Sequence, residues 1–151
     1  MLNYSFHIPT IVESGAGISK SSGPLLKKAG ASCVFIVTDQ GVRQAGLLNG
    51  IEQSLRDEKV NYAVFDRTEP NPSAESIMNG LAECRACNAD YVVAVGGGSS
   101  IDTAKGIAIM ANNEGHILDY EGVGKLKHRG LPLMVIPTTA GTGSGVTAST
   151  I

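Results

Sequence analysis

The sequence has few of the residues that mark several common classes of protein. It contains no tryptophan, 5% aromatic residues and only three cysteines among 151 residues. No apolar run approaches the ~20 residues that a membrane-spanning helix needs, and the first ten residues lack the basic and apolar regions of a signal peptide. The odd cysteine count offers no obvious disulfide framework. These absences together predict a cytoplasmic protein with free thiols and no membrane partner.

Charge is also sparse. Charged residues make up 17% of the chain, the formal net charge is −2 and the pI is near 5.9. The single basic cluster, at 125–129, is typical of a solvated loop. Because no basic stripe is present, we do not expect a nucleic-acid partner.

Residues that usually build metal and catalytic centres are scattered. His7, His116 and His128 form no H-x-x-H or H-x-x-x-H pair. Cys84 and Cys87 form a C-x-x-C pair, but it lies late in an expected helix and has no second Cys/His pair at zinc-site spacing. We therefore expect inert or buried thiols, no metal site and no Ser–His–Asp or Cys–His catalytic set.

Glycine, in contrast, is abundant: there are 19, roughly 13% of the chain against a usual ~7%. Most glycines follow short apolar runs, which alternate with segments of helical period. The pattern predicts strands at 33–37, 61–65, 91–95 and 133–136, a β-rich segment at 4–13, and helices at 19–29, 43–58, from Ser73 onward and at 100–113. Continuously apolar strands joined by helical crossovers indicate one α/β domain with a doubly wound, mainly parallel, Rossmann-like sheet.

Ligands of such sheets bind outside the carboxyl ends of the strands. Three unusual loops follow predicted strands, at 38–41, 96–100 and 137–145. We expect these three loops to converge in space.

The loop at 96–100 contains three consecutive glycines, Gly96, Gly97 and Gly98, at a junction between strand and helix. Such a junction exposes backbone amides and the positive end of a helix dipole, which suit a phosphate. We expect Ser99 to be the N-cap with Asp102 at N3. A tight turn with an ordinary cap is the alternative, although one glycine would suffice for it.

The other two loops carry oxygen atoms that a nucleotide could use. Asp39 could accept hydrogen bonds from a ribose and repel a ribose 2′-phosphate, or it could merely form a local Asx-turn. The loop at 137–145 offers four hydroxyls and three glycines directly after a strand. Standard fingerprints are missing, because Gly15 and Gly17 lack the last glycine of G-x-G-x-x-G and no G-x-x-x-x-G-K-[ST] loop is present.

Several motifs together resemble one enzyme family. They are FHIPTIVESGAG (6–17), VTDQG (37–41), PNP (70–72), VVAVGGGSSIDTAKGIA (92–108), DYEG (119–122) and GLPLMVIPTTAGTGS (130–144). This set, which covers the whole chain, closely resembles the iron-containing (group III) alcohol dehydrogenases. Members are two-domain enzymes with an N-terminal α/β domain that binds NAD(P) and a C-terminal helical domain that holds a divalent metal, usually iron.

The resemblance implies that residues 1–151 form an NAD(P)-binding domain of an enzyme that interconverts primary alcohols or diols and aldehydes by hydride transfer. The Asp39 carboxylate favours NAD over NADP. The implied cofactor-binding residues are Asp39, Asn71, Gly97, Gly98, Ser99, Asp102, Thr138, Thr139, Thr142, Ser144 and Thr147. A small alcohol or aldehyde would be the substrate, and a homo-oligomer is expected.

Two departures from the family pattern matter. Gly145 stands where the family usually has a glutamate. The family's metal ligands, an aspartate and three histidines, come after the segment that ends at Ile151. We therefore expect Fe²⁺ or another divalent metal only in the complete enzyme, and an isolated chain that lacks catalysis. A non-catalytic nucleotide-binding module, or a domain of a glycerol dehydrogenase or dehydroquinate synthase-like enzyme, remains the alternative.

Overall fold

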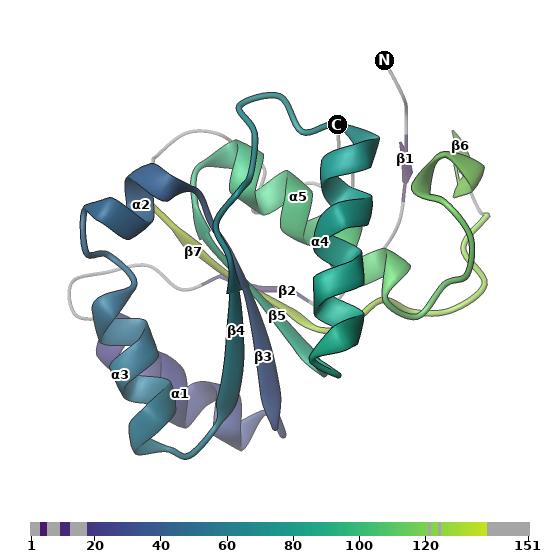
Figure 1. Ribbon diagram of the computed structural model, residues 1–151. Coiled ribbons are helices and arrows are strands. Elements are labelled where there is room, and N and C mark those ends of the chain that lie inside the picture. The colour runs from purple at the N-terminus through teal and green to yellow at the C-terminus, as the bar shows by residue number, and fades with distance from the viewer. Residues whose placement is uncertain (1–3, 6–9, 13–17, 121, 124, 139–151) are drawn as a thin grey trace.

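The computed structural model describes residues 4–5, 10–12, 18–120, 122–123 and 125–138 (Figure 1). Its main sheet has five parallel strands in the order β2-β7-β5-β3-β4. The strands are β2 (Thr10–Val12), β3 (Cys33–Val37), β4 (Asn61–Phe65), β5 (Tyr91–Gly96) and β7 (Leu133–Pro137). A separate parallel pair joins β1 (Tyr4–Ser5) to β6 (Gly122–Val123). The predicted parallel α/β sheet is therefore confirmed.

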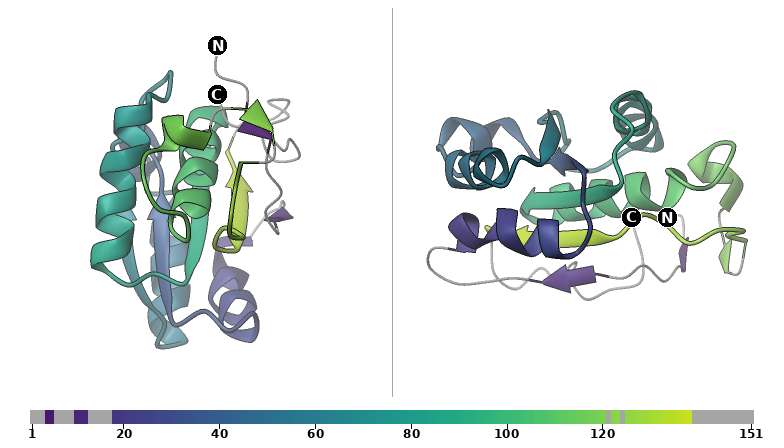
Figure 2. Two further views of the ribbon diagram at one scale, coloured as in Figure 1. Left: turned by 90° about the vertical axis from the view of Figure 1, so that its right-hand side faces the viewer. Right: turned by 90° about the horizontal axis from the view of Figure 1, so that it is seen from below.

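Helices cover both faces of this sheet (Figures 1 and 2). They are α1 (Ile18–Lys28), α2 (Gln40–Gln44), α3 (Asn49–Asp57), α4 (Ala74–Ala86), α5 (Gly98–Met110) and the 3-10 helix η1 (Ile117–Tyr120). Alternate residues of each strand serve opposite cores: in β3, Phe35 packs with the α4 and α5 core, whereas Ile36 packs with the α1 and α3 core. Among the described residues, no helix is long and apolar enough to cross a bilayer.

The predicted single helix at 43–58 is wrong. The structure has two helices, α2 and α3, separated by a turn in which Gly46 adopts a φ of +76°. A left-handed residue cannot continue an α-helix, and glycine adopts this conformation at little steric cost. The turn buries Leu48 (1% exposed) and leaves Leu47 47% exposed. The two leucines, which the helical period could not distinguish, thus have different environments.

Two glycines bring α4 and α5 close together rather than forming turns. A Cβ atom on Gly80 would lie 2.5 Å from Ile107 Cδ1, and one on Gly106 would lie 2.8 Å from Ile77 Cδ1. Both distances are shorter than real Cβ contacts, so a side chain at either position would displace an isoleucine of the other helix. Part of the glycine excess therefore serves helix packing, which fixes the position of α5 over the sheet.

The strand order creates a crevice at one point of the sheet. From β3 the chain moves outward to β4, and then crosses back to place β5 on the other side of β3. Crossovers on opposite sides of β3 leave a gap between the carboxyl ends of β3 and β5, the position at which doubly wound sheets bind ligands.

Candidate nucleotide-binding site

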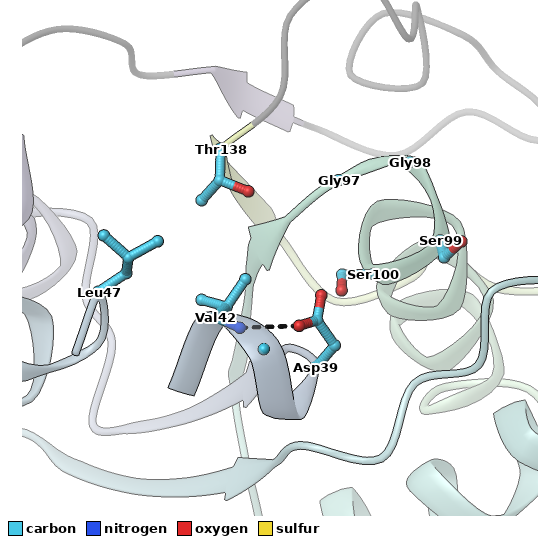
Figure 3. Close-up of a pocket in the computed structure, with 9 residues that line it drawn as sticks. Asp39, Val42, Leu47, Gly97, Gly98, Ser99, Ser100 and Thr138 are labelled. Atoms are coloured by element: carbon cyan, nitrogen blue, oxygen red, sulfur yellow. Dashed lines mark hydrogen bonds between the residues drawn. The ribbon is translucent and has the colours of Figure 1, made fainter. Parts of the chain in front are cut away.

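A hollow of about 430 Å³ lies at this switch point (Figure 3). Its walls come from the end of β3, from α2 and the turn after it, from the first turn of α5 and from the residue after β7. The lining residues are Asp39, Gly41, Val42, Leu47, Gly97, Gly98, Ser99, Ser100 and Thr138. The predicted convergence of three loops is therefore confirmed for their described parts. Residues 139–145 of the third loop lie outside the described residues.

The first turn of α5 faces the hollow without a capping side chain. The N-cap is Gly97, in an extended conformation, and no side-chain hydrogen bond caps the helix. The first amides of a helix have no intrahelical acceptor. At α5 these amides, together with the positive end of the helix dipole, are consequently suited to an anionic ligand.

The prediction that Ser99 is the N-cap and Asp102 is N3 is wrong. Gly98 already has helical geometry, so Ser99 is the second residue of α5 and Asp102 the fifth. The Ser99 hydroxyl instead donates a 2.6 Å hydrogen bond to the carbonyl of Pro70. This bond ties the loop before α4 to the rim of the hollow, and it leaves the helix amides uncapped.

Gly96 allows β5 to meet α5 at a sharp turn. Its φ is +147°, a conformation that residues with side chains rarely adopt. A Cβ at this position would lie 2.8 Å from Ser100 Oγ and 3.5 Å from Asp39 Oδ2. Glycine therefore permits both the turn and the close approach of Asp39 to the start of α5.

Asp39 faces this start of α5 from the end of β3 (Figure 3). Its Oδ1 accepts a 2.8 Å hydrogen bond from the Val42 amide and so caps α2. The local turn that the sequence left as one alternative is thus present. It uses only one carboxylate oxygen, because Oδ2 has no hydrogen bond to any described residue. The second oxygen can accept a hydrogen bond from a ligand hydroxyl.

A hydroxyl network that the sequence analysis missed braces the floor of the hollow. Thr38 Oγ1 donates a 2.7 Å bond to the Val95 carbonyl and thereby joins the ends of β3 and β5. Thr68 Oγ1 donates a 3.0 Å bond to the Thr38 carbonyl and lies 3.1 Å from Ser100 Oγ. A threonine directly after a buried strand was the available signal, because a buried hydroxyl requires a partner.

The other candidate residues occupy different positions. Thr138 lines the hollow, and its amide donates a 2.9 Å bond to the Gly96 carbonyl. Asn71 is exposed and does not line the hollow, although its neighbour Pro70 contacts Ser99. The remaining candidates of the third loop, Thr139, Thr142, Ser144 and Thr147, and the unusual Gly145, lie outside the described residues. Four lining residues were not among the predicted site residues, namely Gly41, Val42, Leu47 and Ser100.

A buried acid and base follow one turn further along α5. Asp102 is 4% exposed and Lys105 is 1% exposed. Burial lowers the pKa of Lys105, and the negative charge of Asp102 acts in the opposite direction. The two side chains therefore interact electrostatically, and neither lines the hollow itself.

The described residues do not fit a resident metal. None of their His, Cys, Asp and Glu side chains form a group of three or more that could hold a metal ion. No metal-assisted step can therefore be derived from this part of the chain.

The fold and the site together define an α/β domain with a crevice suited to an anionic nucleotide. A comparison with protein families matches residues 9–151 to iron-containing alcohol dehydrogenase. The chain belongs to this family.

Individual relatives agree with the family assignment. The chain is 42% identical to choline dehydrogenase of Bacillus subtilis over 147 residues, which are 95% of the chain and 37% of that protein. Among solved structures, a 1,3-propanediol oxidoreductase superposes with a TM-score of 0.82 at 34% identity, covering 95% of this chain and 37% of the other. Sulfoacetaldehyde reductase from Bifidobacterium kashiwanohense, solved in complex with NAD+, superposes with a TM-score of 0.76 at 29% identity, covering 93% and 37%. The chain thus spans a little over a third of the length of these relatives.

Proposed function

We propose that this chain is the NAD-binding domain of an iron-dependent alcohol dehydrogenase, which interconverts primary alcohols or diols and aldehydes. One observation carries the proposal: across one hollow at the topological switch point, an uncapped helix N-terminus faces a carboxylate oxygen to which no described residue donates. Phosphates and ribose hydroxyls are the groups that these two features would recognise.

The hollow accommodates the parts of a dinucleotide in a definite order. The pyrophosphate would bind the amides of Gly97, Gly98 and Ser99, where no side chain competes. The adenosine ribose would donate to Asp39 Oδ2. The adenine would then lie toward Val42 and the exposed Leu47 on the same wall.

The remaining implied residues would complete this binding site. Thr138 would contact the cofactor from the end of β7, and Thr139, Thr142, Ser144 and Thr147 would extend that wall. Asn71 would approach from the loop before α4, and Asp102 would lie toward the nicotinamide.

The carboxylate of Asp39 favours NAD over NADP. A 2′-phosphate would place two further negative charges beside an aspartate that already caps α2 through its other oxygen. Like charges in a partly desolvated crevice repel strongly. The preference therefore depends on the charge of Asp39 and not on the shape of the hollow.

Bound NAD would accept a hydride from the alcohol carbon in the complete enzyme. The chain's own residues would bind and orient the dinucleotide. Residues 1–151 are then the cofactor domain, and the metal ligands belong to a helical domain outside it. We propose cytoplasmic location and homo-oligomeric assembly for the enzyme, as for the family.

Isothermal titration calorimetry of the chain with NAD+ tests the proposal. We expect saturable 1:1 binding, with ADP binding at the same site because it supplies the adenosine and the pyrophosphate. The absence of heat for both ligands at millimolar concentration would refute it. Catalytic inactivity of the chain alone with NAD+ and a primary alcohol is also expected.

A further inference from the structure

All three cysteines of the chain lie together at the amino edge of the sheet, opposite the nucleotide hollow. Cys33 is the first residue of β3, Cys84 lies in the last turn of α4, and Cys87 is the C-cap of α4. The sequence draws attention to the C-x-x-C pair, but the fold adds Cys33, which is 54 residues away from Cys87.

Asp90 fixes the segment after α4 against the start of β3. Its carboxylate accepts hydrogen bonds from the Ser32 hydroxyl at 2.6 Å, the Ser32 amide at 3.0 Å and the Cys33 amide at 3.1 Å. The Asp90 amide donates in return to the Cys33 carbonyl at 3.0 Å. These four bonds hold Cys87, three residues earlier, beside Cys33.

The thiols of Cys33 and Cys87 are neighbours. Cys33 Sγ lies 3.4 Å from the Cys87 carbonyl oxygen, to which it donates. Cys87 Sγ donates to the Cys84 carbonyl at 3.2 Å. Cys33 and Cys87 are both half-buried and open to small reagents, whereas Cys84 is 1% exposed and packs in the core.

We propose that Cys33 and Cys87 form a reversible intrachain disulfide when the protein meets a peroxide, and that Cys84 takes no part in it. One thiolate attacks a peroxide oxygen, the O–O bond breaks, and a sulfenic acid forms with release of water or an alcohol. The second thiolate then attacks that sulfur, the S–S bond forms and the S–O bond breaks with release of water. Two thiols lose two electrons and two protons in total, and the peroxide gains them.

The surroundings of the pair make this reaction slow at neutral pH. Burial raises the pKa of Cys33 to about 11, and the neighbouring Cys87 thiol and the Asp90 charge act in the same direction. Burial likewise raises the pKa of Cys84 to about 12, with Arg85 alone acting against it. Since only the thiolate attacks, crosslinking should be more than about tenfold faster at about pH 9.5 than at about pH 7.

Tryptic peptide mapping after hydrogen peroxide treatment tests the proposal directly. Cleavage after Arg85 separates Cys84 (peptide 68–85) from Cys87 (peptide 86–105), and Cys33 lies in peptide 29–43. We expect a non-reduced link between 29–43 and 86–105 that dithiothreitol removes. Links from 68–85 to 86–105, links between chains only, or no link at about pH 9.5, where thiolates are more abundant, would overturn it.

Variants provide the matched control. Cys84→Ala should retain the link, whereas Cys33→Ala and Cys87→Ala should each abolish it. If Cys84→Ala does not fold, the wild-type peptide map still identifies the pair. Calorimetry of the oxidised chain should give NAD+ binding within about twofold of the reduced chain, because the pair lies at the edge of the sheet opposite the hollow.

Discussion

The two edges of the sheet use polar groups in opposite ways. At the amino edge, the Asp90 carboxylate accepts hydrogen bonds from the Ser32 hydroxyl, the Ser32 amide and the Cys33 amide. Both of its oxygens therefore have partners within the chain. At the carboxyl edge, Asp39 uses one oxygen on Val42, and the first turn of α5 has no cap. Asp90 therefore stabilises the fold through internal hydrogen bonds, whereas Asp39 keeps one carboxylate oxygen available for a ligand.

This contrast separates stability from binding. A polar group with internal partners contributes to folding, whereas a group left without partners in a crevice is available to a ligand. Changes at the amino edge should thus alter unfolding without altering nucleotide affinity. Changes at the carboxyl edge should do the reverse, except where they strain the backbone.

The largest effect is expected for Gly96→Ala. The new methyl group would meet Ser100 Oγ in a backbone conformation that alanine rarely adopts. Displacing the start of α5 should weaken NAD+ binding at least about tenfold and lower the free energy of unfolding by about 1–3 kcal/mol. Calorimetry and urea denaturation measure the two quantities.

Gly30→Ala provides the control at the other edge. Gly30 has a φ of +92° but nothing lies within 4 Å of the added Cβ. It should lose stability through backbone strain and keep its nucleotide affinity. If Gly96→Ala and Gly30→Ala lost the same NAD+ affinity, the proposed difference between the two edges of the sheet would be contradicted.

Asp39→Asn should have the next largest effect. The amide oxygen can still cap α2, but the negative charge that repels a 2′-phosphate is lost. We expect the ratio of NAD+ to NADP+ affinity to fall about tenfold. Competition binding with both nucleotides measures the ratio, and Asp66→Asn, at the end of the neighbouring strand, should leave it unchanged.

Asp90→Asn should reduce stability by about 1–2 kcal/mol without changing nucleotide binding. Burial raises the pKa of Asp90, but hydrogen bonds from Ser32 and Cys33 outweigh it and hold the pKa below its usual value. A lowered folded-state pKa stabilises the fold above the unfolded pKa of about 3.9, and the benefit disappears as pH falls through the folded value. Urea denaturation should therefore show the wild-type advantage at neutral pH and its loss in acid; an advantage that grows in acid would contradict this assignment.

Leu47→Ser should have the smallest effect. Leu47 is 47% exposed on the wall proposed for the adenine, so stability should barely change while NAD+ binding weakens about two- to fivefold. Leu118→Ser is a matched control, because Leu118 is 44% exposed and does not line the hollow. If the two variants bind NAD+ with the same affinity, Leu47 does not contact the adenine.

The sequence predicted the strands better than the starts of the helices. The strands at 33–37 and 61–65 are confirmed at both ends. Burial on two faces leaves a clear apolar run in β3, whereas β4 is an edge strand in which only Phe65 is buried. The N-cap of α5 was misplaced, since three glycines in succession permit several starting points and the serine hydroxyl has a distant partner. The break at Gly46 was missed because the apolar residues that follow it, Leu47 or Leu48, Ile51 and Leu55, maintain a helical period.

The site was predictable where it depended on strand ends and less so where it depended on tertiary contact. Asp39 and the three glycines follow apolar strands, and this position alone placed them at one edge. The contact between Thr68 and Ser100 joins a loop to a helix 32 residues away, and no local sequence pattern predicts such a contact. The nearness of Cys33 to Cys87 was hidden in the same way.

Amide chemical-shift mapping of the chain during titration with NAD+ tests the central claim most directly. We predict that the chemical-shift changes concentrate at the amides of Gly97, Gly98, Ser99 and Val42. The Val42 amide is included because it donates a hydrogen bond to Asp39. The amide chemical shifts of Ser32, Cys33 and Asp90 should not change. Shifts centred on the amino edge, or spread evenly over both edges, would contradict the assignment of the nucleotide to the carboxyl edge of the sheet.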